Sequence, residues 1–291
     1  MYMIQLFVNG LTVIWRQKKL ILMFWLLNLI MGLIFSLPYK NTFGQFFSHR
    51  LISRLLARQN IYTYIAELRY WMADSIAEST TYLRIGGILL FFITLSFTGG
   101  IIFSIFQKKF PGFKIFAQKS YYYLWAMVKI GLISPLFGLV AVGLAVITSL
   151  PFLIFLPEHF REYTYFYVFL ILALIGMGWS LVANLLLDIV KVQTVRLNML
   201  RVLEVLKQSR KFLSVNLLKV AGLYLLLYII VLLIIILYWQ MPALSDLASW
   251  YGIIFDFLVL QIVIILLVWA RLSRYAIVSE YLQKRDIIEE R

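Results

Sequence analysis

Six long, unbroken runs of apolar residues constrain the fold of this chain more than any other feature of its sequence. The runs cover residues 20–37, 85–106, 130–150, 165–187, 220–238 and 253–269. A helix needs about 20 mostly apolar residues to cross the ~30 Å hydrocarbon core of a bilayer, where lipid offers no partner to an open backbone group. The strands of an outer-membrane barrel would instead alternate over about ten residues. The sequence therefore predicts an all-α membrane helix bundle with six transmembrane helices, built as a single integral membrane domain over residues 1–291.

The composition leads to the same conclusion. The chain has 63% hydrophobic residues, 14% charged residues and no cysteine. Soluble domains have about 45–50% apolar and ~25% charged residues, so a soluble cytosolic enzyme is excluded. Disordered chains have low hydrophobicity and disulfide-stabilised secreted domains are rich in cysteine, so these two classes are excluded as well.

Basic residues are distributed unequally between the two sides of the predicted membrane domain. Most of the 27 Lys and Arg residues lie on the side formed by the N-terminal end, residues 107–129, residues 188–219 and the tail at 270–291. The opposite side carries only Lys40, Arg50, Arg54, Arg58, Arg69, Arg84 and Arg161. Because cytoplasmic loops carry an excess of Lys and Arg, we expect both termini in the cytoplasm.

The formal net charge of +14 indicates contact with lipid rather than with nucleic acid. Anionic headgroups attract each Lys or Arg near the membrane surface by about 1 kcal/mol, and these residues flank the spans. No motif of a nucleic-acid-binding domain is present. We expect membrane lipids as partners, together with a protein partner or a second copy of the chain. Small residues four positions apart, such as Gly176 and Ser180, allow close packing of helices within the chain or between copies.

Short amphipathic segments precede the first, third and fifth spans. They cover residues 6–15, 116–125 and 206–215. Four residues after the end of each segment comes a lysine: Lys19, Lys129 and Lys219. The pattern predicts three copies of one unit, in which an interfacial cytoplasmic helix precedes a membrane hairpin. The three lysines are candidates for contact with lipid headgroups or with a partner.

The longest segment outside the spans covers residues 38–84 on the outer side. Apolar residues recur there at steps of three and four, which predicts a helical outer hairpin over about 43–58 and 60–79. The first of these helices carries Arg50, Arg54 and Arg58 on one stripe. This stripe is a candidate contact for anionic lipid or for an acidic partner, and a merely solvated face is the alternative.

Four polar residues interrupt the apolar runs: Asn28, Asn184, Asp256 and Gln261. A carboxylate at mid-depth costs ~2.5–3.5 kcal/mol on insertion scales, so it normally faces protein or water. We predict that these residues line a polar cleft between helices. Interhelical hydrogen bonds are the alternative for the amides, and an interfacial position is the alternative for Asp256. Asp188, at the inner end of the fourth span, is expected to pair with Lys191 or Arg271.

The sequence contains few of the residue patterns that carry catalysis. Both histidines, His49 and His159, lie in predicted outer loops, and the chain has no cysteine to complete a zinc site. No Gly-x-Ser-x-Gly motif and no phosphate-binding glycine loop are present. We therefore expect a non-enzymatic protein that uses neither a metal ion nor a cofactor.

Several short motifs resemble those of a known group of membrane proteins. They are Trp15–Lys19 followed by Phe24–Leu29, Asp188–Lys191 after the fourth span, Gly222–Leu227 in the fifth, and Arg271–Ala276 closing the sixth. In these motifs the chain resembles poorly characterised bacterial six-span integral membrane proteins, similar to the membrane domain attached to some glycerophosphodiester phosphodiesterases. The resemblance implies a multi-pass protein of the bacterial inner membrane. The soluble phosphodiesterase domain of such fusions has no counterpart in this sequence, so the resemblance implies no hydrolysis.

Two hypotheses for function follow from the sequence. The first is a non-enzymatic integral membrane component that supports or regulates a partner protein or a membrane process. The alternative is transport or lateral handling of a lipid or amphiphile, including a role as the membrane subunit of an ATP-driven transporter. The first predicts a stoichiometric partner. The second predicts a bound amphiphile and sensitivity to substitution of Asn28, Asp256 and Gln261.

Overall fold

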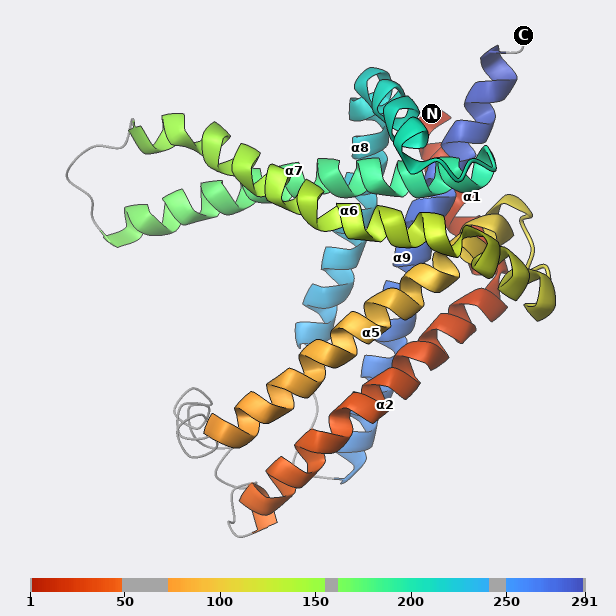
Figure 1. Ribbon diagram of the computed structural model, residues 1–291. Coiled ribbons are helices and arrows are strands. Elements are labelled where there is room, and N and C mark those ends of the chain that lie inside the picture. The colour runs from red at the N-terminus through yellow and green to blue at the C-terminus, as the bar shows by residue number, and fades with distance from the viewer. Residues whose placement is uncertain (1, 49–72, 155–161, 241–249, 290–291) are drawn as a thin grey trace. The chain divides into compact units, whose positions relative to one another are not determined.

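The computed structural model describes residues 2–48, 73–154, 162–240 and 250–289. These residues form seven helices and no strand, as Figure 1 shows. The helices are α1 (Tyr2–Arg16), α2 (Lys18–Ser48), α5 (Ala73–Phe106), α6 (Phe113–Ile154), α7 (Glu162–Arg196), α8 (Val202–Gln240) and α9 (Trp250–Glu289). The predicted all-α class is confirmed.

Six of the described helices are long and apolar enough to cross a membrane, which confirms the six-span prediction. The qualifying segments are Lys18–Leu37, Thr80–Phe106, Phe113–Pro151, Val168–Arg196, Val202–Gln240 and Ile254–Lys284. Several of the helices extend well beyond the predicted spans. α6, for example, has 42 residues, or roughly 63 Å at 1.5 Å per residue, whereas the hydrocarbon core is ~30 Å thick.

The three predicted interfacial segments are helical, but they join their spans in different ways. The first forms the separate helix α1, which ends at Arg16, and Gln17 stands between it and α2. The carbonyl of Gln17 accepts hydrogen bonds from the backbone N–H groups of Leu20 and Ile21, so it starts the ladder of α2. The second and third segments continue without interruption into α6 and α8. Once a helix has nucleated, each further residue adds one hydrogen bond, so polar surface residues need not end it.

The chain groups into two compact units. Unit 1 comprises Met1–Arg16, Leu95–Leu227 and Ser273–Arg291, and unit 2 comprises Gln17–Thr94 and Tyr228–Leu272. Helices α5, α8 and α9 are each divided between the two units, with one segment in each.

Close helix crossings define the core of unit 1. A Cβ atom on Gly100 of α5 would lie 2.8 Å from the carbonyl oxygen of Phe116 in α6, and one on Gly99 would lie 2.5 Å from Cβ of Tyr123. A Cβ atom on Gly10 of α1 would lie 3.0 Å from Cα of Ile277 in α9. Glycine is therefore required where the backbones approach this closely.

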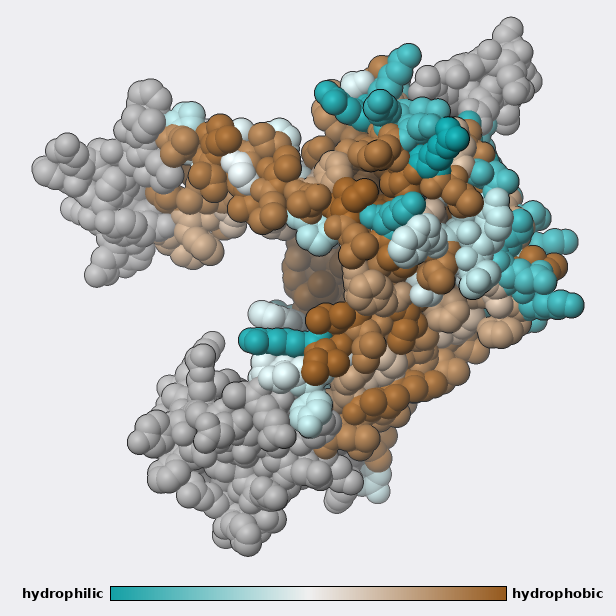
Figure 2. Space-filling view, in the orientation of Figure 1, coloured by the Kyte–Doolittle hydropathy of each residue, from teal (hydrophilic) through white to brown (hydrophobic). Residues whose placement is uncertain are grey.

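Helices α6 and α7 pack against each other as an antiparallel pair (Figure 1). The side chain of Ala145 would be 4.0 Å from a Cβ atom on Gly176, and Trp179 Nε1 donates a hydrogen bond to Thr148 Oγ1 at 3.2 Å. Elsewhere the pair exposes large apolar side chains, such as Leu139 and Phe169, and Figure 2 shows this apolar surface in brown. Such a surface is suited to contact with lipid tails.

Unit 2 contains α2, the first part of α5, the last part of α8 and the first part of α9. A Cβ atom on Gly86 of α5 would lie 2.5 Å from ring atoms of Phe35 in α2. Trp25 Nε1 of α2 donates a hydrogen bond to Gln261 Oε1 of α9 at 3.0 Å. α2 therefore packs closely against α5 and is joined to α9 by this hydrogen bond.

Most of the predicted outer hairpin lies outside the described residues. α2 continues to Ser48 and α5 begins at Ala73, so both described ends of this segment are helical. The stripe of Arg50, Arg54 and Arg58 lies outside the described residues, as do His49 and His159.

Candidate functional site

A buried carboxylate joins three helices of unit 1. Asp188 of α7 is only 3% exposed. Its Oδ1 lies 3.2 Å from Nζ of Lys191, and its Oδ2 accepts a hydrogen bond from the hydroxyl of Tyr224 in α8 at 3.2 Å. Arg274 of α9 places Nη1 3.7 Å from the same Oδ2. A buried charge needs such partners, because the desolvation of an unpaired carboxylate is very costly.

The expected pairing of Asp188 with Lys191 is confirmed. Residues three apart lie on neighbouring positions of one helix face, so the sequence alone could indicate this contact. The second cation is Arg274 rather than Arg271, which is exposed. The sequence analysis does not identify Tyr224 as a partner of Asp188. Tyr224 is fully buried, and a buried tyrosine usually finds a hydrogen-bond partner for its hydroxyl.

Other polar side chains of unit 1 also join separate elements. Tyr123 OH donates to Asn198 Oδ1 at 2.9 Å, Ser209 Oγ to Gln193 Oε1 at 2.7 Å, and Tyr281 OH to Asn216 Oδ1 at 2.9 Å. Lys108 Nζ lies 2.8 Å from Oε1 of Glu280. Together with the group around Asp188, we call these residues the polar layer. Asn198 and Lys108 are exposed, whereas the other members are buried or half-buried. Buried polar groups that satisfy one another fix the register of the helices that carry them.

The connection between α7 and α8 is a tight turn that starts at Asn198. Met199 N–H donates to the carbonyl of Thr194 and Asn198 N–H donates to that of Val195, which is the hydrogen-bond pattern of a Schellman cap. Asn198 has φ 52°, a left-handed conformation that asparagine tolerates better than most residues. The turn brings residues 198–204 beside α6.

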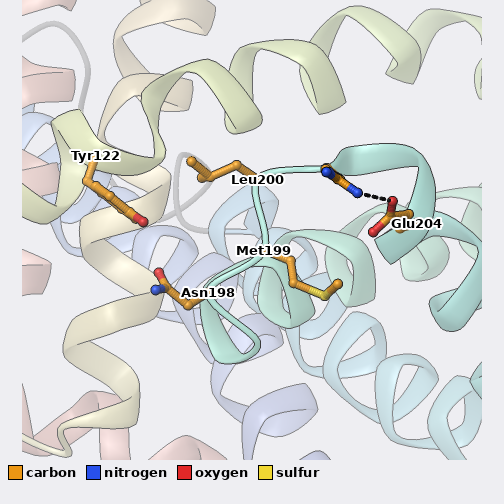
Figure 3. Close-up of a pocket in the computed structure, with 6 residues that line it drawn as sticks. Tyr122, Asn198, Met199, Leu200 and Glu204 are labelled. Carbon is orange, nitrogen blue, oxygen red and sulfur yellow. Dashed lines mark hydrogen bonds and ion pairs between the residues drawn. The ribbon is translucent and has the colours of Figure 1, made fainter.

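Two adjoining pockets lie between this connection and α6. The first, of about 360 Å³, is lined by Tyr122, Asn198, Met199, Leu200, Arg201 and Glu204. Figure 3 shows the side chains of Tyr122 and Asn198 at one end of it and the ion pair of Arg201 with Glu204 at the other. The second, of about 620 Å³, is lined by Lys129, Leu132, Ile133, Leu200, Arg201, Val202, Leu203 and Glu204. Because the two share Leu200, Arg201 and Glu204, we treat them as one groove, which we call the α6 groove.

The four residues predicted to form a polar cleft lie in different surroundings. Gln261 accepts the hydrogen bond of Trp25 described above, and Asn28 Nδ2 donates to the carbonyl of Phe24 in its own helix at 2.8 Å. Asp256 is half-buried. These three residues belong to unit 2, whereas Asn184 belongs to unit 1 and is exposed. The polar cleft stays a prediction.

The three predicted anchor lysines, Lys19, Lys129 and Lys219, are all exposed. Lys129 differs from the other two in lining the α6 groove. Its Nζ also lies 5.5 Å from the centre of the Trp125 ring, within the range of a cation–π contact. Among the residues that the structure describes, no cluster of three or more His, Cys, Asp or Glu side chains could hold a metal ion.

Comparisons of this chain with protein-family models, with curated proteins and with solved structures give no match.

Proposed function

We propose that the protein is a non-enzymatic membrane component that supports or regulates a partner protein or a membrane process at the cytoplasmic face of a bacterial inner membrane. The observation that carries the proposal is the two-sided character of the first part of α8. Its buried side is fixed to α7 and α9 through Ser209 and Asn216. Its other side exposes cations to the surroundings: Lys207, Arg210, Lys211 and Lys219.

The exposed side of this segment also carries large apolar residues. Val215 is 75% exposed and Leu218 is 89% exposed. In Figure 2 hydrophilic side chains of unit 1 gather over the start of α8. A surface that combines cations with isolated apolar side chains suits an acidic, amphipathic partner at the membrane surface. The polar layer behind it holds this surface in a fixed position.

Reversing three charges on α8 tests this proposal. We expect the variant Lys207→Glu, Arg210→Glu, Lys211→Glu to lose a stoichiometric protein that copurifies with the wild-type chain, because like charges then oppose an acidic partner. The measurement is extraction in a lipid-retaining polymer, followed by mass spectrometry of all copurifying proteins and lipids.

The control variant reverses two other lysines of unit 1, Lys109 and Lys114, which are also exposed but lie on the turn before α6 and at the start of α6. It should retain the partner. Absence of any stoichiometric protein from the wild-type sample, or equal loss from both variants, would contradict the proposal.

The alternative function, transport or lateral handling of an amphiphile, is favoured by one observation in unit 2. The hydrogen bond between Trp25 and Gln261 joins two polar groups inside an apolar bundle, and the half-buried Asp256 lies five residues before Gln261 in α9. Under this hypothesis, Asp256→Asn combined with Gln261→Ala should reduce the amount of bound lipid and disturb the cellular phenotype. If lipid content and phenotype both remain as in the wild type, the amphiphile hypothesis fails.

A further inference from the structure

We propose that the α6 groove is a binding site for an anionic phospholipid. The phosphate would be held between Lys129 and Arg201, and the first part of an acyl chain would lie against Leu132, Ile133 and Leu203. This inference stands apart from the proposed function, because a lipid site on α6 requires no protein partner on α8.

The groove changes from polar to apolar along α6. Tyr122 and Lys129 are two helical turns apart on the same side of the helix, and Leu132 and Ile133 follow within the next turn. The distance along the axis from Tyr122 to Ile133 is roughly 16 Å at 1.5 Å per residue. The residues after Ile133 form the apolar run of the third span. The polarity of the groove therefore has the same direction as that of a phospholipid standing in the membrane.

The two cations are accessible to a phosphate group. The side chain of Arg201 is 82% exposed, and its partner Glu204 is 46% exposed at an Nη1–Oε1 distance of 3.0 Å. Exposed ion pairs of this kind are weak, so the guanidinium can turn to a phosphate, which it can bind through two parallel hydrogen bonds. Lys129 adds a second positive charge, and against the one carboxylate of Glu204 the groove keeps a net positive charge.

The turn at Asn198 creates the groove. It carries Leu200 and Arg201 to the side of α6, where they line both pockets. Lys219, which occupies the position equivalent to Lys129 in the third repeat, is exposed but lines neither pocket. The repeat thus offers a matched residue of the same type outside the groove.

The volume fits part of a lipid. The larger pocket, of about 620 Å³, falls within the range of ~300–1,000 Å³ typical of small-molecule sites. It accommodates a headgroup with the first part of one chain, while the remainder of the lipid would stay in the bilayer along the apolar run of α6.

Binding can be measured on the full-length protein by native mass spectrometry with defined lipids. The probes are phosphatidylglycerol and phosphatidylcholine with identical acyl chains. We expect tighter binding of phosphatidylglycerol, and we expect the variant Lys129→Ala, Arg201→Ala to weaken it about fivefold for each charge removed. Both side chains are exposed, so the melting temperature should not change.

The control variant, Arg210→Ala with Lys219→Ala, removes the same two residue types from α8 outside the groove. It should keep the wild-type affinity for phosphatidylglycerol. Equal loss in the two variants would show general surface attraction and overturn the proposal. Equal binding of the two lipids by the wild-type protein would overturn it as well.

Two further measurements identify what the groove recognises. Glycerol phosphate, which lacks acyl chains, should fail to displace phosphatidylglycerol at equal concentration; if it competes equally well, the site takes a free phosphate compound and the proposal is wrong.

Leu203→Asp should weaken binding although both cations remain, because it puts a charge where the acyl chain would lie. Unchanged binding in Leu203→Asp would contradict the assigned position of the chain.

Discussion

Replacing Asp188 with asparagine is expected to lower the free energy of unfolding by about 3 kcal/mol. Removing one member of a buried ion pair typically costs about 3–5 kcal/mol, because the partner charge is left uncompensated. Here the side chains of Lys191 and Arg274 are 17% and 22% exposed, which favours the lower end of the range. The asparagine oxygen can still accept the hydrogen bond of Tyr224. The decrease in the free energy of unfolding therefore measures the contribution of the negative charge of Asp188. Titration with SDS in mixed micelles measures the difference.

The chain contains a matched control for this prediction. Arg201 and Glu204 form a second ion pair with the same spacing of three residues, but both side chains are exposed. Glu204→Gln should therefore change the free energy of unfolding by at most about 1 kcal/mol. Adding Lys191→Met to Asp188→Asn should recover part of the lost stability, since it removes one uncompensated cation. Similar effects of Asp188→Asn and Glu204→Gln would contradict the structural role assigned to the buried group.

Replacing Gly100 with alanine is expected to destabilise the protein by about 1–3 kcal/mol, the usual cost of inserting a methyl group into a filled space. The new Cβ atom would meet the carbonyl oxygen of Phe116 at 2.8 Å and also the hydroxyl of Ser120. A backbone carbonyl cannot turn away as a flexible side chain can, so α5 and α6 would have to separate. Unfolding in the same mixed micelles, or the melting temperature in detergent, measures the effect.

Gly138→Ala provides the control for Gly100→Ala. Gly138 also lies inside a helix, but a Cβ atom there would meet nothing within 4 Å. Alanine is the better helix former by about 1 kcal/mol, so this substitution should be neutral or stabilising. The two changes are chemically identical and have opposite expected signs. If both destabilise the protein equally, the close crossing of α5 and α6 is not the cause.

The sequence predicts the number and type of the long helices well, because an apolar run of about 20 residues has few other ways to satisfy its backbone. It predicts the end of α5 at Phe106 but not the full extent of every helix. Residues 116–125 and 206–215 have the polar pattern of separate surface helices, yet they continue into α6 and α8. The break at Gln17 agrees with the prediction, in which the interfacial segment over residues 6–15 ends before a span that begins at residue 20.

The candidate site likewise contains one contact that the sequence predicts and others that it does not. The contact between Asp188 and Lys191 is local to one helix, so spacing alone could predict it. Tyr224 and Arg274 come from other helices, and their approach depends on how each helix is rotated in the packed unit. The α6 groove depends on the left-handed residue Asn198. Asparagine is enriched in that conformation, but the sequence does not specify which helix the turn will meet.

The crossing of α1 and α9 at Gly10 and Ile277 has a consequence for the biogenesis of the protein. Synthesis runs from the N-terminus, so the site on α9 that receives α1 is made only after the intervening helices. Until α9 has been synthesised, α1 lacks this packing partner. An amphipathic helix with a basic end can rest on the membrane surface during that time. The pair α6 and α7, by contrast, is joined by contacts close in sequence and can form while α9 is still on the ribosome.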